Sequence, residues 1–210
     1  RGRDVNADGR TIDPSAVSPR ERYQLITSLV VPRPIGWIST YGEDGTPNLA
    51  PFSYFAALSS SPMLVGVSIG HRQGIPKDTL SNVRARGAFA VNVVCERLLE
   101  PMNASSADVP AGVDEFLLAG LESARCASVD APHVVDCPAV LECVVEKEVP
   151  LAEAPNTLVI GRVMRVLLAA GVTSLAGSLE IDPASLRPVG RLSGAQYGLL
   201  GEIRTIPRPG

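Results

Sequence analysis

The sequence predicts a mainly β protein, a closed or nearly closed antiparallel barrel with flanking helices. Three observations support this fold class. Six or more segments have β-type composition and alternating apolar residues, few segments have a helical pattern, and Gly42-Glu43-Asp44-Gly45 is a strong hairpin turn. Regular alternation of strands and helices, which a doubly wound parallel sheet requires, is absent from the pattern. The 210 residues are enough for one domain with a substantial core.

The N-terminal elements are predicted from local signals. Residues 1–17 are polar and lack periodicity, so we expect a loosely ordered segment followed by a single domain over 18–210. Ser18-Pro19-Arg20-Glu21 combines an N-cap serine, a proline at the first helical position and a glutamate at N3. The helix that begins there should run to about Thr27 and end before Pro32.

The remaining elements follow from apolar periodicity. The predicted strands are 34–41, 49–58, 63–69, 89–94, 139–149 and 158–168. Residues 59–62, with three serines and a proline, read as a connection, and helices are expected over 78–86 and 97–106. Residues 107–138 are rich in Pro, Gly and Asp and are predicted to be irregular. A loop of that length in a compact domain is usually functional or faces a partner.

Composition excludes several classes of protein. A net charge of −3 argues against a nucleic-acid binder, and no apolar run reaches the ~18 residues that span a bilayer. We see no apolar signal-peptide region at the start of the sequence. The four cysteines are scattered without a CxxC pair and there are only two histidines, so no metal site is expected. These features favour a cytoplasmic protein whose cysteines are small buried hydrophobes, although a redox pair of Cys137 and Cys143 stays open.

Residues 76–79 have the composition of an anion site. We expect Asp78 to cap a helix that begins at Thr79, with the unsatisfied amides of the first turn pointing outward. Lys77 would add a positive charge and Thr79 a hydroxyl donor, which together suit a phosphate monoester. A capped helix beside an ordinary surface lysine is the simpler alternative.

Two strand segments have side chains that suit a flat heteroaromatic ring. Pro51 cannot donate a ladder hydrogen bond, so its strand is interrupted or lies at an edge. The main-chain groups left free there, with the Asn48 amide, match the donors and acceptors of a flavin pyrimidine ring; plain turn chemistry is the alternative. Trp37 shares one strand face with Ser39 and Tyr41. Its indole lies either in the core or beside the ring, with Ser39 or Thr40 donating to the attached chain.

Eight segments, in order along the chain, resemble one known family. They are PRPIGWIST, NLAPFSYF, PKDTLSNV, FAVNVV, MNASSADVPAGVDEFLLAGL, CPAVLEC, LVIGRV and RLSGAQYG. Together they resemble the flavin reductase-like family with an FMN-binding split β-barrel, and within it the flavoredoxin-type branch. The resemblance spans residues 23–209, so it covers nearly the whole domain.

The resemblance implies a homodimer that binds FMN non-covalently at its interface. The residues that it assigns to the cofactor are Trp37, Ser39, Thr40, Asn48, Ala50, Pro51, Phe52, Ser53, Ser68, Ile69, Lys77 and Thr79. It also suggests that His133, from the same subunit or from the partner subunit, reaches the ring edge, and that Arg33 assists with the phosphate or the reductant. The gly-rich end of the chain lacks the spacing of a dinucleotide fingerprint, so NAD(P)H would bind only transiently over the flavin.

Three functions remain open at this point. The first is an NAD(P)H-dependent flavin reductase that supplies reduced flavin to a monooxygenase partner. The second is a flavoprotein that retains FMN and carries electrons or reduces a small organic substrate. The third is a non-catalytic module for flavin or haem, with His71 or His133 as the axial ligand. Hydride transfer needs alignment more than acid–base groups, so no catalytic residue is assigned, and Asp114 and Glu115 are interpreted as a solvated pair or a helix N-terminus.

Overall fold

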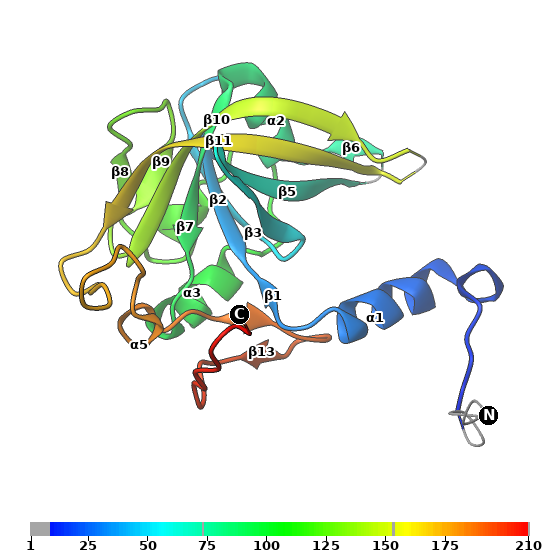
Figure 1. Cartoon of the computed structure of the whole chain (residues 1–210). Coiled ribbons are helices and arrows are strands. Elements are labelled where there is room, and N and C mark those ends of the chain that lie inside the picture. Colours follow the sequence, from blue (N-terminus) through cyan, green and yellow to red (C-terminus); the bar gives the residue numbers. More distant parts are fainter. Residues whose placement is uncertain (1–8, 73, 153, 210) are drawn as a thin grey trace.

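The computed structural model describes residues 9–72, 74–152 and 154–209. Its centre is a strongly curved antiparallel sheet with strand order β3-β2-β7-β10-β11-β5-β4, and β6 pairs with β5 (Figure 1). The bounds are β2 (Gly36–Tyr41), β3 (Pro47–Phe52), β4 (Phe55–Ser60), β5 (Met63–Arg72), β6 (Ile75–Pro76), β7 (Ala88–Val93), β10 (Ala139–Pro150) and β11 (Asn156–Leu168). In these residues β3 and β4 end the sheet without pairing with each other, so the barrel is split rather than closed.

Smaller elements surround the sheet. Two small sheets are formed by β1 (Arg33–Pro34) with β12 (Gly190–Arg191) and β13 (Tyr197–Gly198), and by β8 (Ser123–Arg125) with β9 (Pro132–Val134). The helices are η1 (Pro14–Ala16), α1 (Pro19–Leu29), α2 (Asp78–Arg86), η2 (Glu96–Leu98), α3 (Leu99–Ala104), α4 (Glu115–Leu118) and α5 (Pro183–Leu186). No helix in the described ranges has both the length and the apolar character needed to cross a bilayer.

Local signals predict the element types well and their boundaries less well. The capping box of Ser18 and Glu21 is confirmed in both directions, and α1 continues two residues beyond Thr27. The predicted strand 49–58 is broken at Ser53 and Tyr54 into β3 and β4, and β4 runs on to Ser60, where the sequence predicts a connection. The break lies just after Pro51, where the ladder lacks a donor.

Two further expectations need correction. The segment 107–138 contains α4, β8 and β9 and is therefore not irregular throughout. Of the predicted loose segment 1–17, residues 1–8 lie outside the described residues, and the rest includes the short η1. The division into that segment and a domain over 18–210 stays a prediction.

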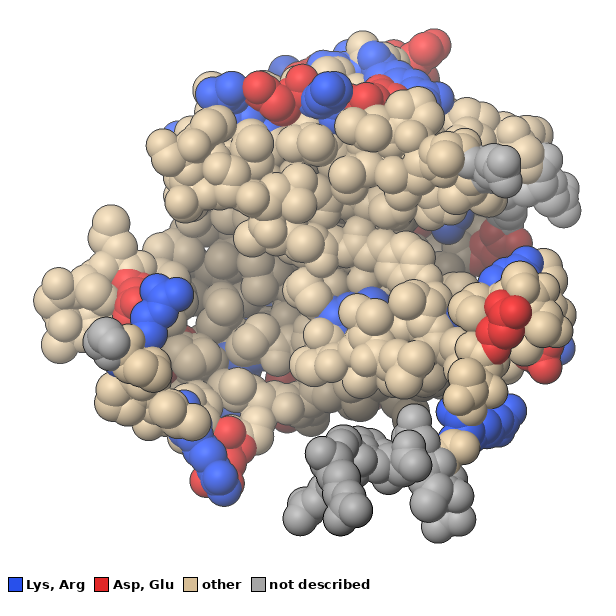
Figure 2. Space-filling model, turned by 45° about the vertical axis from the view of Figure 1, so that its right-hand side comes forward, with Lys and Arg blue, Asp and Glu red and all other residues tan. Residues whose placement is uncertain are grey.

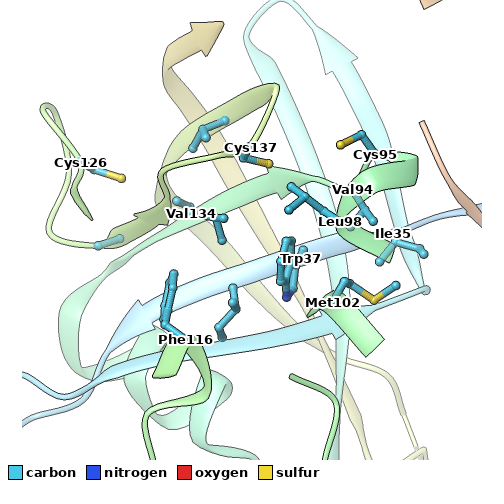
Figure 3. Packing of buried hydrophobic residues seen from close by; sticks show 14 of the residues in the cluster. Ile35, Trp37, Val94, Cys95, Leu98, Met102, Phe116, Cys126, Val134 and Cys137 are labelled. Atoms are coloured by element: carbon cyan, nitrogen blue, oxygen red, sulfur yellow. The ribbon is translucent and has the colours of Figure 1, made fainter. Parts of the chain in front are cut away.

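The sheet has a hydrophobic cluster on each of its faces. Because successive side chains of β2 point to opposite faces, Trp37 belongs to one cluster and Ile38 to the other. The outer cluster, shown in Figure 3, packs β2 against α3, α4 and the β8–β9 hairpin. The inner cluster fills the barrel around Phe89. There Gly161 is required, because a Cβ on it would lie 2.3 Å from the Phe89 ring.

The N-terminal helix extends away from the sheet (Figure 1). Its apolar residues Tyr23, Ile26 and Leu29 are exposed, Leu29 to 75%. Arg33 holds the base of this helix: its guanidinium donates to the Thr27 carbonyl at 2.5 Å, to the Val30 carbonyl and to the Leu192 carbonyl. The C-terminal end of this helix is therefore held by hydrogen bonds from Arg33, while its apolar side chains are exposed.

Candidate functional site

A cavity of about 510 Å³ lies between edge strand β3, the start of α2 and the segment that follows α3. Its walls are formed by Asn48, Ala50, Pro51, Phe52, His71, Ile75, Pro76, Lys77, Asp78, Thr79, Ser105, Ser106, Ala107, Asp108, Val109, Pro110, Ala111 and Glu115. This volume falls within the range of small-molecule and cofactor sites. The position of β3 at the edge of the sheet, predicted from Pro51, is confirmed.

The start of α2 forms the cationic end of the cavity. Lys77 is the N-cap residue and Asp78 the first helical residue, so the predicted cap by Asp78 is wrong. Among the described residues no side chain caps this end, which leaves first-turn amides available to an anion. The ammonium group of Lys77 lies 5.7 Å from the centroid of the Phe52 ring. Positive charge and an aromatic surface therefore meet at one end of the cavity.

The wall formed by β3 is mainly apolar. Ala50, Pro51 and Phe52 contribute to it, and Val109 and Pro110 also line the cavity. Pro51 has no N–H group, and Phe52 is only 8% exposed. Such a wall suits the face of a planar ring, since it offers apolar contact without a competing hydrogen-bond donor at Pro51.

A buried hydrogen-bond chain forms the polar wall. The Asn48 side-chain nitrogen donates to both carboxylate oxygens of Glu115 at 3.0 Å, and the Leu49 amide donates to one of them at 3.0 Å. The Asn48 side-chain oxygen accepts from the hydroxyls of Thr79 at 3.0 Å and Thr40 at 3.3 Å. One carboxylate is thus connected through an amide to two hydroxyls.

Glu115 lies at a helix N-terminus, one of the two alternatives for Asp114 and Glu115, but it is buried rather than solvated. It is 6% exposed and lies in the first turn of α4, which Asp114 caps by accepting from the Phe116 and Leu117 amides. Burial raises the pKa of the Glu115 carboxyl, the bonds from Leu49 and Asn48 oppose that rise, and the charge of Asp78 adds to it. Asn48 lies 67 positions away in sequence, so no local signal indicates the pairing.

Trp37 belongs to the core, which is the first of the two alternatives that the sequence analysis gave for its indole. Its side chain is fully buried in the middle of the residues in Figure 3. The indole nitrogen donates to the Ser105 hydroxyl at 2.9 Å, and Ser105 lines the cavity. Trp37 therefore supports the cavity wall from behind, through Ser105.

Ser39 and Thr40 are also fully buried and do not line the cavity. The Ser39 hydroxyl donates to the Pro132 carbonyl at 2.6 Å and accepts from the Asn92 side chain. Thr40 accepts from the Asn82 side chain and donates to Asn48. Since both hydroxyls have protein partners, these residues position other groups and are not placed to touch a ligand.

Three more predicted cofactor residues lie outside the cavity lining. Ser53 is half-buried and its hydroxyl accepts from Arg33 at 3.4 Å. Ser68 is half-buried and accepts from the Asn156 side chain at 3.1 Å. Ile69 is fully buried in the inner cluster. These three residues therefore lie near or on the strands of the sheet without lining the cavity.

Arg33 and His133 of the same chain do not line the cavity. Arg33 is 6% exposed, and its guanidinium donates to the Thr27, Val30 and Leu192 carbonyls and to the Ser53 hydroxyl, so its donors have partners within the chain. His133 lies on β9, where its ring is 4.0 Å from the Cys126 sulfur, and it does not line the cavity. His71 lines it instead, with Nδ1 3.0 Å from the Pro155 carbonyl.

The structure brings half of the twelve predicted cofactor residues to one cavity. They are Asn48, Ala50, Pro51, Phe52, Lys77 and Thr79.

The four cysteines form no disulfide and are buried, and burial raises the pKa of Cys126, Cys137 and Cys143 to about 12. Within the described ranges, no three His, Cys, Asp or Glu side chains are grouped to hold a metal ion.

Comparison with known proteins identifies the family. The family model described as "Flavin reductase like domain" matches residues 28–176. The chain belongs to this family. A relative from Halalkalibacterium halodurans, the uncharacterized protein BH2278, is 36% identical, with 94% of this chain and 96% of the relative covered.

Two solved structures show how the fold of this flavin reductase-like protein recurs. Nitrilotriacetate monooxygenase component B from Bacillus cereus has a TM-score of 0.89 at 30% identity, covering 94% of this chain and 98% of that chain. The 2-nitrobenzoate 2-nitroreductase NbaA of Pseudomonas fluorescens has a TM-score of 0.86 at 27% identity, covering 95% and 96%. The predicted antiparallel split barrel is thereby confirmed.

Proposed function

We propose that this protein is an FMN-binding oxidoreductase that passes a hydride from NAD(P)H to flavin. The observation that carries the proposal is one cavity with a cationic, amide-rich end at Lys77 and an apolar wall at Pro51 and Phe52. A phosphate and a planar ring on one molecule need that pair of surfaces. Family membership supports a flavin as the ligand.

In this proposal the chain binds and aligns, and the cofactor supplies the reactivity. FMN, when bound, provides a ring that accepts a hydride, two electrons and one proton, from the nicotinamide, which leaves oxidised as NAD(P)⁺. Lys77 and the first amides of α2 hold the phosphate. Pro51 and Phe52 would support the ring, and Val109 and Pro110 also line the cavity in which it would bind. Such alignment needs no side-chain acid or base.

The recipient of the electrons is proposed from the relatives. The similarity to a monooxygenase component B favours release of reduced flavin to a monooxygenase partner. The similarity to NbaA, described as a nitroreductase, favours a second candidate, in which FMN stays bound and a small organic compound is reduced in the same cavity. Free exchange of bound FMN with added flavin distinguishes the first candidate from the second. The unpaired buried thiols fit a reducing cytoplasm, where we place the protein.

Anaerobic reduction tests the proposed reaction. Protein loaded with FMN should lose its visible flavin absorbance on addition of NADH or NADPH, faster than free FMN at the same concentration. The protein accelerates the step because it removes the entropy cost of aligning two rings. A rate equal to that of free FMN with both nucleotides contradicts the proposal.

We further propose a homodimer with the cavity near the interface. The exposed apolar residues of α1 need a cover, and Figure 2 shows a face whose central area is uncharged, with Lys, Arg, Asp and Glu mostly at its edges. A symmetric second copy is the common solution. Light scattering at micromolar concentration should give twice the chain mass, and substituting Leu29 by Asp should shift the mass to that of one chain. A wild-type protein with the mass of one chain contradicts this proposal.

A further inference from the structure

The hydrogen bonds of the polar wall have a direction, and Glu115 determines it. An ionised carboxylate can only accept, so the group that faces it must be the Asn48 nitrogen, as the two 3.0 Å contacts require. The Leu49 amide holds the same carboxylate from the backbone at 3.0 Å. The oxygen and nitrogen of an Asn side chain are assigned from its hydrogen-bond partners, and here Glu115 determines which of the two faces it.

The direction continues to Thr79. With its nitrogen toward Glu115, Asn48 turns its oxygen to the Thr79 hydroxyl, 3.0 Å away. A hydroxyl has one proton, and Thr79 uses it on Asn48. Toward the cavity Thr79 therefore offers lone pairs alone, and the sequence-based interpretation of Thr79 as a donor to phosphate does not hold while Glu115 is ionised.

We propose that Glu115 is a positioning residue that makes the Thr79 hydroxyl an acceptor toward the ligand. The inference rests on the proposed function, since the ligand is taken to be FMN. Thr79 then receives a hydrogen bond from a hydroxyl of the ribityl chain, and the phosphate dianion depends on Lys77 and the α2 amides. The phosphate is held by fewer donors than the cavity contains, which suits a flavin that must be released.

A neutral residue at position 115 should reverse the donor and acceptor roles along this series of hydrogen bonds. In Glu115→Gln the new side-chain amide can donate to the Asn48 oxygen, and the Asn48 nitrogen then turns to Thr79. The Thr79 proton becomes available to a phosphate oxygen, while one of the two contacts between Asn48 and residue 115 and the long 3.3 Å bond from Thr40 are lost. A hydrogen bond to a charged acceptor is worth enough for an affinity change of about tenfold.

A double-mutant cycle tests this inference with FMN and riboflavin as probes. Glu115→Gln should tighten FMN binding about tenfold, leave riboflavin binding nearly unchanged, and have no such effect in a Thr79→Val background. A gain that persists with Thr79→Val shows that Glu115 acts through its charge alone and overturns the inference, as does the absence of any gain. Wild-type protein without measurable affinity for FMN overturns both this inference and the proposed function.

A second measurement needs no flavin, so it tests the role of Glu115 separately from the proposed function. The NMR signals of the Asn48 side-chain amide should follow the titration of Glu115, with a midpoint above the ordinary range of a glutamate. Asp78, the charged neighbour from α2, provides the control, because Asp78→Asn should keep the titration and Glu115→Gln should remove it. An Asn48 amide that does not respond to the carboxyl overturns the inference even if FMN binds. An amide that responds supports it even where Glu115→Gln fails to fold.

Discussion

Replacing Trp37 by alanine should lower the free energy of unfolding by about 3–5 kcal/mol, the usual cost of deleting a large buried aromatic side chain. The indole is fully buried among the residues of the outer cluster, so its loss leaves a cavity that α3 and α4 cannot fill without moving. The Ser105 hydroxyl also loses its donor. Urea denaturation measures the change, as a lower midpoint at an unchanged slope.

Two matched variants separate packing from hydrogen bonding at Trp37. Trp37→Phe keeps most of the buried ring and should cost less than Trp37→Ala. Ser105→Ala keeps the ring and leaves the indole N–H without a partner, at a cost of about 1–3 kcal/mol. If Trp37→Ala left the stability unchanged and weakened flavin binding, the assignment of Trp37 to the core would be contradicted, and a contact between its indole and the flavin ring would be favoured.

Replacing Lys77 by alanine should weaken FMN binding about tenfold and leave riboflavin binding nearly unchanged. Lys77 is the N-cap of α2 and the cationic side chain that we assign to the phosphate, and a charge-assisted bond is worth about this much. Since Lys77 is exposed before the ligand binds, the difference between wild type and variant should shrink as salt is added. Titration of flavin fluorescence with each ligand at two salt concentrations measures it.

Arg84 provides the matched control for Lys77. It lies in the last turn of the same helix and its ion pair with Glu148 is outside the cavity, so Arg84→Ala removes one positive charge without touching the site. This variant should bind FMN as the wild type does. Equal loss of FMN and riboflavin affinity in Lys77→Ala would show that the phosphate lies elsewhere and that Lys77 acts only through its contact with Phe52.

The fold could be predicted from the sequence because its signals are local or ordered along the chain. The capping box at Ser18 lies within four residues, and in the turn after β2 the Gly42 amide donates to the Thr46 carbonyl at 2.8 Å. Pro51 marked an edge strand without any partner being known. The order of eight family motifs then indicated the split barrel, which the family model and the solved structures support.

The site could be predicted only in part, because residue type does not reveal which face of a buried strand is covered. Trp37 and Ser39 were placed at a ligand since β2 reads as half-buried, but the β8–β9 hairpin and α3 cover its outer face as well. The burial of Glu115 could not be predicted for the opposite reason. Its sequence neighbours suggest a solvated pair or a helix N-terminus, and only its contact with the distant Asn48 shows that it is a buried member of the cavity wall.

The most direct measurement for the account as a whole is an equilibrium titration of the protein with FMN, followed by quenching of flavin fluorescence. We expect saturation at one FMN per chain, with tighter binding of FMN than of riboflavin because Lys77 and the α2 amides recognise the phosphate. Fluorescence that stays unquenched, or riboflavin that binds as tightly as FMN, would contradict a phosphate-anchored flavin in the cavity between β3 and α2.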